Sequence, residues 1–230
     1  MSAIVPTSGR ASGTRRDNIS KKEGNMRIIK SVAALALLGW TTMASAHFVW
    51  LEPAGENKVR AYFGEWADDQ REKTEGFLGK VVVEPSVNGK KVKPSATGAD
   101  YFEFEARGDT RLGQPVLFKE TLVDYNARLG RTDTKALLPL EIAPTAAGGN
   151  TFVLTFEGKP LAKTEVTVFG PPKWMKQFHT DEAGKFTIET PWAGQYVLEA
   201  GHTVEKNGQH DGKPFTKTRF VTTLTFERAK

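Results

Sequence analysis

Residues 151–170, TFVLTFEGKPLAKTEVTVFG, contain two short runs in which apolar and polar residues alternate. The apolar side chains that share a face are Phe152, Leu154 and Phe156 in the first run and Val166 and Val168 in the second. A period of two residues is typical of a half-buried β-strand, and the Gly158-Lys159-Pro160 segment between the runs contains turn formers. The stretch therefore predicts two β-strands, each with one buried face.

The same alternation continues on both sides of this stretch. Towards the C-terminus it recurs around Phe186, Tyr196 and Phe220, with Gly, Asn and Asp turn signals between the runs. The strands predicted in the first half span residues 47–51, 59–63, 80–84, 100–106 and 116–125. Residues 66–75 are the best helical candidate, and their polarity favours a surface loop. The chain is therefore expected to be all-β.

A break in the pattern divides the chain. Pro139, Pro144 and the Gly148-Gly149 pair interrupt the alternation. This interruption predicts two β domains, one over residues 47–137 and one over residues 138–230.

The N-terminal segment has the composition of an export signal. Residues 26–46 hold a short basic start, an apolar run over residues 31–40 and the small residues Ala44-Ser45-Ala46. This order is typical of a cleavable signal peptide, and the apolar run is too short to span a bilayer. Residues 1–25 are polar and are predicted to be a disordered or over-called extension. A periplasmic protein that begins at His47 is expected.

Charge and cysteine content exclude several classes of function. The chain has 32 basic and 27 acidic residues, and residues 1–46 hold 7 and 2 of these, which leaves 25 of each. A chain balanced in this way gives no indication of nucleic acid as a partner. The absence of cysteine excludes thiolate zinc sites and cysteine nucleophiles.

Three segments of the second half carry a resemblance. They are residues 158–162, 180–186 and 191–196. Together they resemble the carboxypeptidase-regulatory-like, transthyretin-like domain. This resemblance implies a seven-stranded sandwich for the second domain. Together with the break near residue 137, the chain is expected to fold as two β-sandwich (immunoglobulin/transthyretin-like) domains. Within it Asp181 is expected to bond its own backbone in a tight turn, with Gly184 at positive φ and Phe186 in the core.

The wider chain resembles a bacterial family of exported two-domain β proteins. The segments that carry this likeness are residues 47–51, 59–65, 201–205, 211–215 and 222–226. The function of the family is unassigned, and its members are often labelled as periplasmic components of nickel uptake. The resemblance implies a metal ion and an inner- or outer-membrane metal transporter as partners.

His47 is the residue that points most directly to chemistry. As the first residue after cleavage it would offer the α-amine and the ring Nδ1 to one metal ion, and an α-amine has a pKa of about 8. A second histidine would complete a site for Ni, Cu or Co. His202, followed by Glu205, and His210 are the candidate partners. The alternation of a regular strand places His202 and Glu205 on opposite faces.

Three functions remain open from the sequence. The first is a non-enzymatic metal-binding accessory protein for nickel, copper or cobalt uptake or handling. The second is a β module that binds another ligand or a protein without a metal. The third is a copper redox enzyme built on the N-terminal histidine. The sequence favours the first, because the family resemblance and His47 agree.

Overall fold

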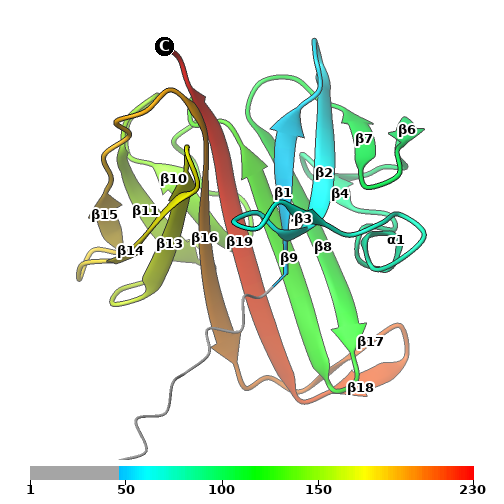
Figure 1. Ribbon diagram of the computed structural model, residues 1–230. Helices are drawn as coiled ribbons and strands as arrows, with labels where there is room; N and C mark the ends of the chain where they lie inside the picture. The colour runs from blue at the N-terminus through cyan, green and yellow to red at the C-terminus, as the bar shows by residue number, and fades with distance from the viewer. Residues whose placement is uncertain (1–46) are drawn as a thin grey trace, which may run out of the picture. The chain divides into compact units, whose positions relative to one another are not determined.

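The computed structural model describes residues 47–230, which lie within one compact unit (Figure 1). The predicted extension and signal peptide, residues 1–46, lie outside the described residues. Nearly every described segment is a strand or a turn, which confirms the all-β prediction. The only helix in this range is α1 (Leu78–Val81), and no helix of residues 47–230 has the length and hydrophobicity needed to cross a bilayer.

An eight-stranded sheet forms the centre of the structure. Its strands, in spatial order, are β14 (Trp174–His179), β13 (Glu165–Gly170), β16 (Gly194–Val204), β19 (Lys217–Arg228), β9 (Thr121–Leu129), β8 (Thr110–Phe118), β4 (Ser86–Val87) and β5 (Lys90–Lys91). All neighbours are antiparallel except β19 and β9, which are parallel. The long strands β16, β19, β9 and β8 stand side by side in Figure 1. Strands from both halves of the chain therefore form one sheet.

A five-stranded sheet packs on one face of the central sheet. It consists of β1 (Phe48–Pro53), β2 (Lys58–Glu65), β7 (Phe102–Glu105), β6 (Ala96–Thr97) and β3 (Gln70–Arg71). The Thr223 hydroxyl of β19 donates a hydrogen bond to the Val49 carbonyl of β1 at 2.8 Å. The rings of Phe63 and Tyr125 meet edge to face, with their centroids 5.5 Å apart. These contacts fix β1 and β2 against β9 and β19.

A four-stranded sheet packs on the opposite face. It consists of β10 (Leu140–Pro144), β11 (Thr151–Phe156), β12 (Lys159–Pro160) and β15 (Lys185–Thr187). Phe152 and Phe156 of β11 pack against Phe226 and Phe220 of β19, with ring centroids 6.0 and 5.0 Å apart. A separate hairpin is formed by β17 (Gly208–His210) and β18 (Lys213–Phe215).

Strand β19 contributes to both hydrophobic cores. Phe220, Leu224 and Phe226 lie on the face towards the four-stranded sheet, whereas Val221 lies in the core under the five-stranded sheet. Successive side chains of a strand point to opposite faces, so one strand can serve two cores. The strand predicted around Phe220 is confirmed.

The two cores fall largely on either side of the predicted boundary at residue 137. One gathers residues 48–127 together with Phe169, Val197 and Val221, and the other gathers residues 140–226. The central sheet nevertheless runs continuously from one core to the other through the β19–β9 pair. The division into two domains stays a prediction.

Two local predictions in the first half are wrong. Residues 80–84 were predicted as a strand, but α1 begins at Leu78, and Leu78 and Val81 point into the core from a single helical turn. Residues 116–125 were predicted as one strand, but they contain the end of β8 and the start of β9. A turn with Lys119 at φ 54° separates the two strands. Apolar spacing over so few residues does not distinguish a helical turn or a hairpin from a strand.

The predicted turn at residues 181–184 is confirmed. The Asp181 Oδ1 atom accepts backbone N–H groups of Ala183 and Lys185 at 2.9 and 2.8 Å. Gly184 has φ +71°, and Phe186 is buried. The two turn features depend on neighbours within a few residues, and such local turn chemistry can be predicted from sequence. The burial of Phe186 also depends on distant residues, because its ring packs against that of Phe152.

Candidate functional site

His47 lies immediately before β1, with its side chain about one-third exposed (32%). Its ring packs against Phe63 of β2, with the centroids 5.5 Å apart. Phe63 in turn contacts Tyr125 of β9 edge to face. Two successive ring contacts therefore connect His47 to the central sheet. The position of the imidazole is thus fixed by packing.

Two carboxylates contact the two nitrogens of this ring. Glu65 Oε1 lies 3.5 Å from Nδ1, and Glu72 Oε1 lies 3.0 Å from Nε2. The side chains of both glutamates are mostly buried. His47 is therefore held between two acidic groups, one on each side of the imidazole.

The strand register brings these residues together. Phe48 pairs with Gly64 in the β1–β2 ladder, so the next position outward places His47 opposite Glu65. The β2–β3 ladder pairs Gly64 with Arg71, and the backbone N–H of Glu72 donates to the Phe63 carbonyl at 2.8 Å. Hairpin geometry thus closes a sequence separation of 25 residues between His47 and Glu72.

The three side chains do not converge on one point. Nδ1 and Nε2 lie on different sides of the imidazole. The carboxylates of Glu65 and Glu72 therefore lie on opposite sides of the ring and cannot both reach a metal bound to one of its nitrogens. Within residues 47–230 no group of three His, Asp or Glu side chains is arranged to hold a metal ion. A metal at Nδ1 would therefore have two side-chain donors, His47 and Glu65, and would need further donors.

The predicted partner residues lie elsewhere. His202 pairs in register with Phe220, and its ring lies 4.6 Å from that of Phe156, on the core side covered by the four-stranded sheet. Because Val49 contacts the other face of β19, His202 and the strand that follows His47 are on opposite faces of the central sheet. Glu205 follows the end of β16 and is exposed.

His210 lies in the β17–β18 hairpin, where its Nε2 is 3.6 Å from Asp211 Oδ2. The ligand set of His47 with a second histidine thus stays a prediction. Glu65 and Glu72, the nearest acidic neighbours of His47, stand among many acidic residues in the sequence and no local pattern distinguishes them.

Further polar groups share the face of the central sheet that β1 covers. Glu199 pairs in register with Thr223, whose hydroxyl bonds β1. Burial raises the pKa of Glu199 to about 7; nearby Arg219 opposes this rise and Glu165 adds to it. Burial likewise raises the pKa of Tyr125 to about 12, with Arg219 opposing. Glu199 is thus a carboxyl group that changes charge near neutral pH.

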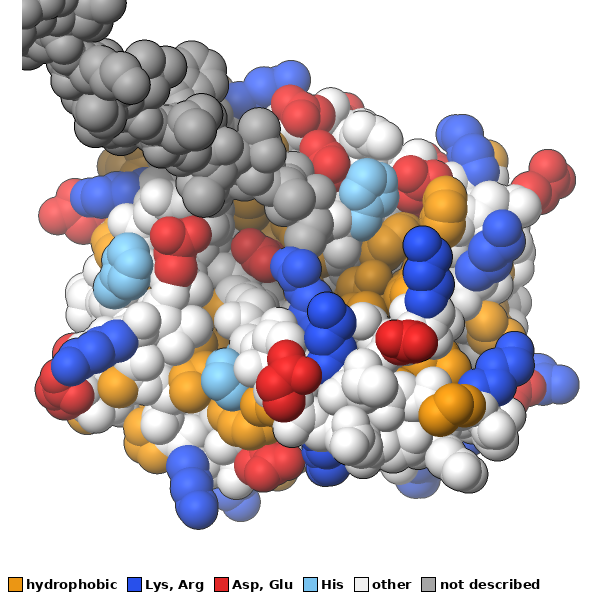
Figure 2. Space-filling view, turned by 90° about the horizontal axis from the view of Figure 1, so that it is seen from below, with side chains coloured by type: hydrophobic (Ala, Val, Ile, Leu, Met, Phe, Trp, Pro, Cys, Tyr) orange, Lys and Arg blue, Asp and Glu red, His pale blue; other side chains and the backbone are white. Residues whose placement is uncertain are grey.

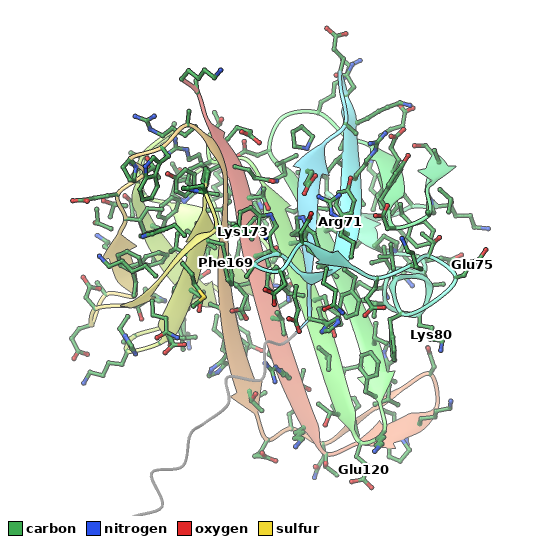
Figure 3. All side chains as sticks on the ribbon, viewed as in Figure 1. Arg71, Glu75, Lys80, Glu120, Phe169 and Lys173 are labelled. Atoms are coloured by element: carbon green, nitrogen blue, oxygen red, sulfur yellow. The ribbon has the colours of Figure 1, made fainter. Side chains whose placement is uncertain are left out.

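One face of the protein is mixed in charge. The face seen in Figure 2 shows basic, acidic and histidine side chains interspersed over the drawn residues. On the outer side of the five-stranded sheet, Arg71 (Figure 3) lies 4.0 Å from the centroid of the Tyr62 ring and donates to Glu52 Oε1 at 3.2 Å. Arg71 is adjacent in sequence to Glu72, and this anchoring helps to hold the segment that contacts His47.

Comparison with known families identifies one domain. Residues 105–204 match the family described as Domain of unknown function (DUF4198). No curated protein and no solved structure matches the chain. The matched region runs from the last residue of β7 to the end of β16 and crosses residue 137. It excludes His47, Glu65 and Glu72.

Proposed function

We propose that the protein is an exported accessory protein that binds a transition-metal ion at a processed N-terminal His47. The observation that carries the proposal is the fixed imidazole of His47 with Glu65 beside Nδ1 and Glu72 beside Nε2. Removal of residues 1–46 in the periplasm would create an α-amine on the same residue. The role that follows is uptake or handling of nickel, copper or cobalt, in company with a membrane transporter.

The chelate would use three donors. The α-amine and Nδ1 of an N-terminal histidine can close a six-membered ring on one metal ion, and an α-amine loses its proton near neutral pH. Glu65, 3.5 Å from Nδ1, is the side chain placed to supply the third donor, an oxygen. Two nitrogens and one oxygen suit Cu(II) and Ni(II), and the general affinity order favours copper.

Glu72 would have a different task. Its carboxylate lies 3.0 Å from Nε2, the nitrogen directed away from such a chelate. A carboxylate in that position accepts the Nε2–H hydrogen bond, which fixes the tautomer with a free lone pair on Nδ1 and raises the basicity of the ring. His47, Glu65 and Glu72 would then act together, although only two of them touch the metal.

The first test is native intact-mass spectrometry on protein exported with its own residues 1–46, with Cu(II) or Ni(II) added. We expect a mass that begins at His47 and retains one metal ion. The metal should be lost in His47→Ala and when one alanine is inserted before His47, because the insertion keeps the imidazole but removes its α-amine. His210→Ala is the matched control and should retain the metal. A chain that begins at His47 and takes up no metal would overturn the proposal.

The two glutamates give a sharper test. Glu72→Gln should weaken metal binding by about tenfold, which is the effect expected from losing an orienting carboxylate. Glu65→Gln should weaken it more, because a donor atom is lost. Competition with a chromophoric chelator measures both affinities. A larger effect at Glu72 than at Glu65 would contradict the Nδ1 chelate.

A further inference from the structure

A pocket of about 530 Å³ lies on the face of β8 and β9 turned away from the five-stranded sheet. Its floor is formed by alternate residues of the two strands, including Gly113, Asp124 and Asn126. One wall is the segment that leads into β10, and the rim opposite includes the β4–β5 turn. This pocket is on the opposite side of the central sheet from His47.

Asn126, one of the residues that line this pocket, carries an acceptor without a partner. The residue is 1% exposed, and its Nδ2 donates to the Asp124 carbonyl at 3.0 Å. Its Oδ1 has no hydrogen-bond partner among the described residues. A buried polar atom without a partner is costly, and native proteins rarely leave one without a reason. The pocket wall therefore includes a residue with an unsatisfied buried acceptor.

Asp124 adds a negative charge beside this acceptor. It lies two residues before Asn126 on the same face of β9, and no described side chain donates to its carboxylate or forms an ion pair with it. Burial raises its pKa to about 6, so the group is ionised at neutral pH in a partly dehydrated setting.

Arg111, the one arginine that lines the pocket, already has hydrogen-bond and ion-pair partners. Arg111 donates from Nε to Glu141 at 2.7 Å and from Nη2 to the Lys135 carbonyl at 2.5 Å, and its Nη2 lies 3.1 Å from Asp133. The guanidinium is thus surrounded by its own acceptors. Residues 47–230 thus provide no cationic side chain that pairs with Asp124.

The pocket also has an apolar wall held in place by the backbone. Leu137 and Leu138 line it, and both of their N–H groups donate to Glu141 Oε2. Leu137 is nevertheless 68% exposed. An apolar wall next to a few polar side chains is typical of a small-molecule site.

We infer that this pocket binds a small organic cation, a primary ammonium group attached to a short aliphatic body. The ammonium would donate to the Asp124 carboxylate and to Asn126 Oδ1, and the aliphatic part would cover Leu137 and Leu138. The Asp124 carboxylate would repel an anion. A neutral alcohol would leave the negative charge of Asp124 without a counter-charge. The inference is independent of the metal site.

The test uses n-butylammonium, n-butanol and butyrate as probes of equal length, titrated into the ¹⁵N-labelled full chain and followed by NMR. We expect saturable shifts from butylammonium at residues of β8, β9 and the segment 137–139. Butanol should bind at least about tenfold more weakly, since a hydrogen bond to a charged group is stronger than a neutral one. Butyrate should give no shifts at these residues.

Two variants and one control locate the site. Asp124→Asn should lose the preference for butylammonium over butanol while the fold is retained. Gly113→Val should block both probes, because a Cβ at this position meets only Leu138 Cδ2, at 3.6 Å, and the larger side chain would extend into the pocket. Asp211→Asn, on an exposed turn, should bind as the wild type does. Equal binding of amine and alcohol, an unchanged preference in Asp124→Asn, or no saturable shift with butylammonium would each overturn the inference.

Discussion

At the scale of single residues, Glu141 is a buried charge held by several hydrogen bonds. It is fully buried and accepts hydrogen bonds from Arg111 Nε at 2.7 Å and Arg128 Nη1 at 2.8 Å. Arg128 is itself fully buried and also donates to Asp109 Oδ2 at 2.9 Å. Because the arginines belong to β8 and β9 and Glu141 to β10, this group ties the central sheet to the four-stranded sheet.

Removal of the Glu141 charge should be strongly destabilising. Glu141→Gln removes the carboxylate that two buried guanidinium groups share. Each keeps one other carboxylate, Asp133 for Arg111 and Asp109 for Arg128. The loss of unfolding free energy should therefore be up to about 3–5 kcal/mol, the cost of breaking a buried pair. Urea unfolding followed by tryptophan fluorescence measures the loss. Glu182→Gln is the control, because its partner Lys163 lies at 2.9 Å but both side chains are exposed. Similar losses in the two variants would show that the buried network contributes little.

At the scale of elements, the β2–β3 turn decides whether Glu72 reaches His47. Gly64 has φ +150°, and a Cβ at that position would lie 2.0 Å from the Gln70 carbonyl oxygen. Only glycine allows β3 to approach β2 so closely. Next to this close approach, the backbone N–H of Glu72 donates a hydrogen bond to the Phe63 carbonyl at 2.8 Å. This bond holds Glu72 beside β2.

Gly64→Ala should therefore act on both stability and the proposed metal site. The strained backbone and the clash should cost about 1–3 kcal/mol, and the displaced Glu72 should weaken metal binding. Thermal unfolding and chelator competition measure the two effects. Gly201→Ala in β16 is the control, because its Cβ would meet only the Phe220 carbonyl oxygen, at 3.7 Å. Wild-type metal affinity in Gly64→Ala would separate the β3 contact from the site.

At the scale of the whole molecule, the central sheet holds a partly buried carboxylate on each of its faces. Glu199 lies on the face covered by β1, and Asp124 lies on the opposite face in the pocket. Burial raises the pKa of Glu199 to about 7 and that of Asp124 to about 6, above the values these groups have in an unfolded chain. The folded state therefore holds these protons more tightly than the unfolded state does.

Stability should consequently fall as pH rises. Between about pH 4 and pH 7 the folded chain binds more protons than the unfolded chain, so the free energy of unfolding decreases with pH. The full shift of about two units corresponds to about 3 kcal/mol for each group. The unfolding temperature should be higher at pH 5 than at pH 8, and the difference should shrink in Asp124→Asn and Glu199→Gln. A pH dependence that both variants leave unchanged would contradict this assignment.

The accuracy of the sequence predictions follows the range of the interactions involved. The strands around Phe152, Val166 and Phe220 and the Asp181 turn could be predicted, since each depends on alternation or hydrogen bonding within a few residues. The helical turn at Leu78 and the hairpin at Lys119 were missed, because short apolar runs satisfy more than one local structure. His47 could be selected from its place after a cleavage pattern, but its neighbours could not.

By itself the sequence determined that residues 47–230 form β-strands and where most of the turns occur, because alternation and turn residues act locally. Only the tertiary structure decided that β19 pairs in parallel with β9 and joins the two halves in one sheet. It likewise decided that Glu65 and Glu72 enclose His47 while His202 faces the other core. The physical reason is that the register of each strand, and the face that each side chain occupies, bring residues together that are distant in the sequence. Side-chain packing over the whole chain selects that register, so no local sequence pattern predicts it.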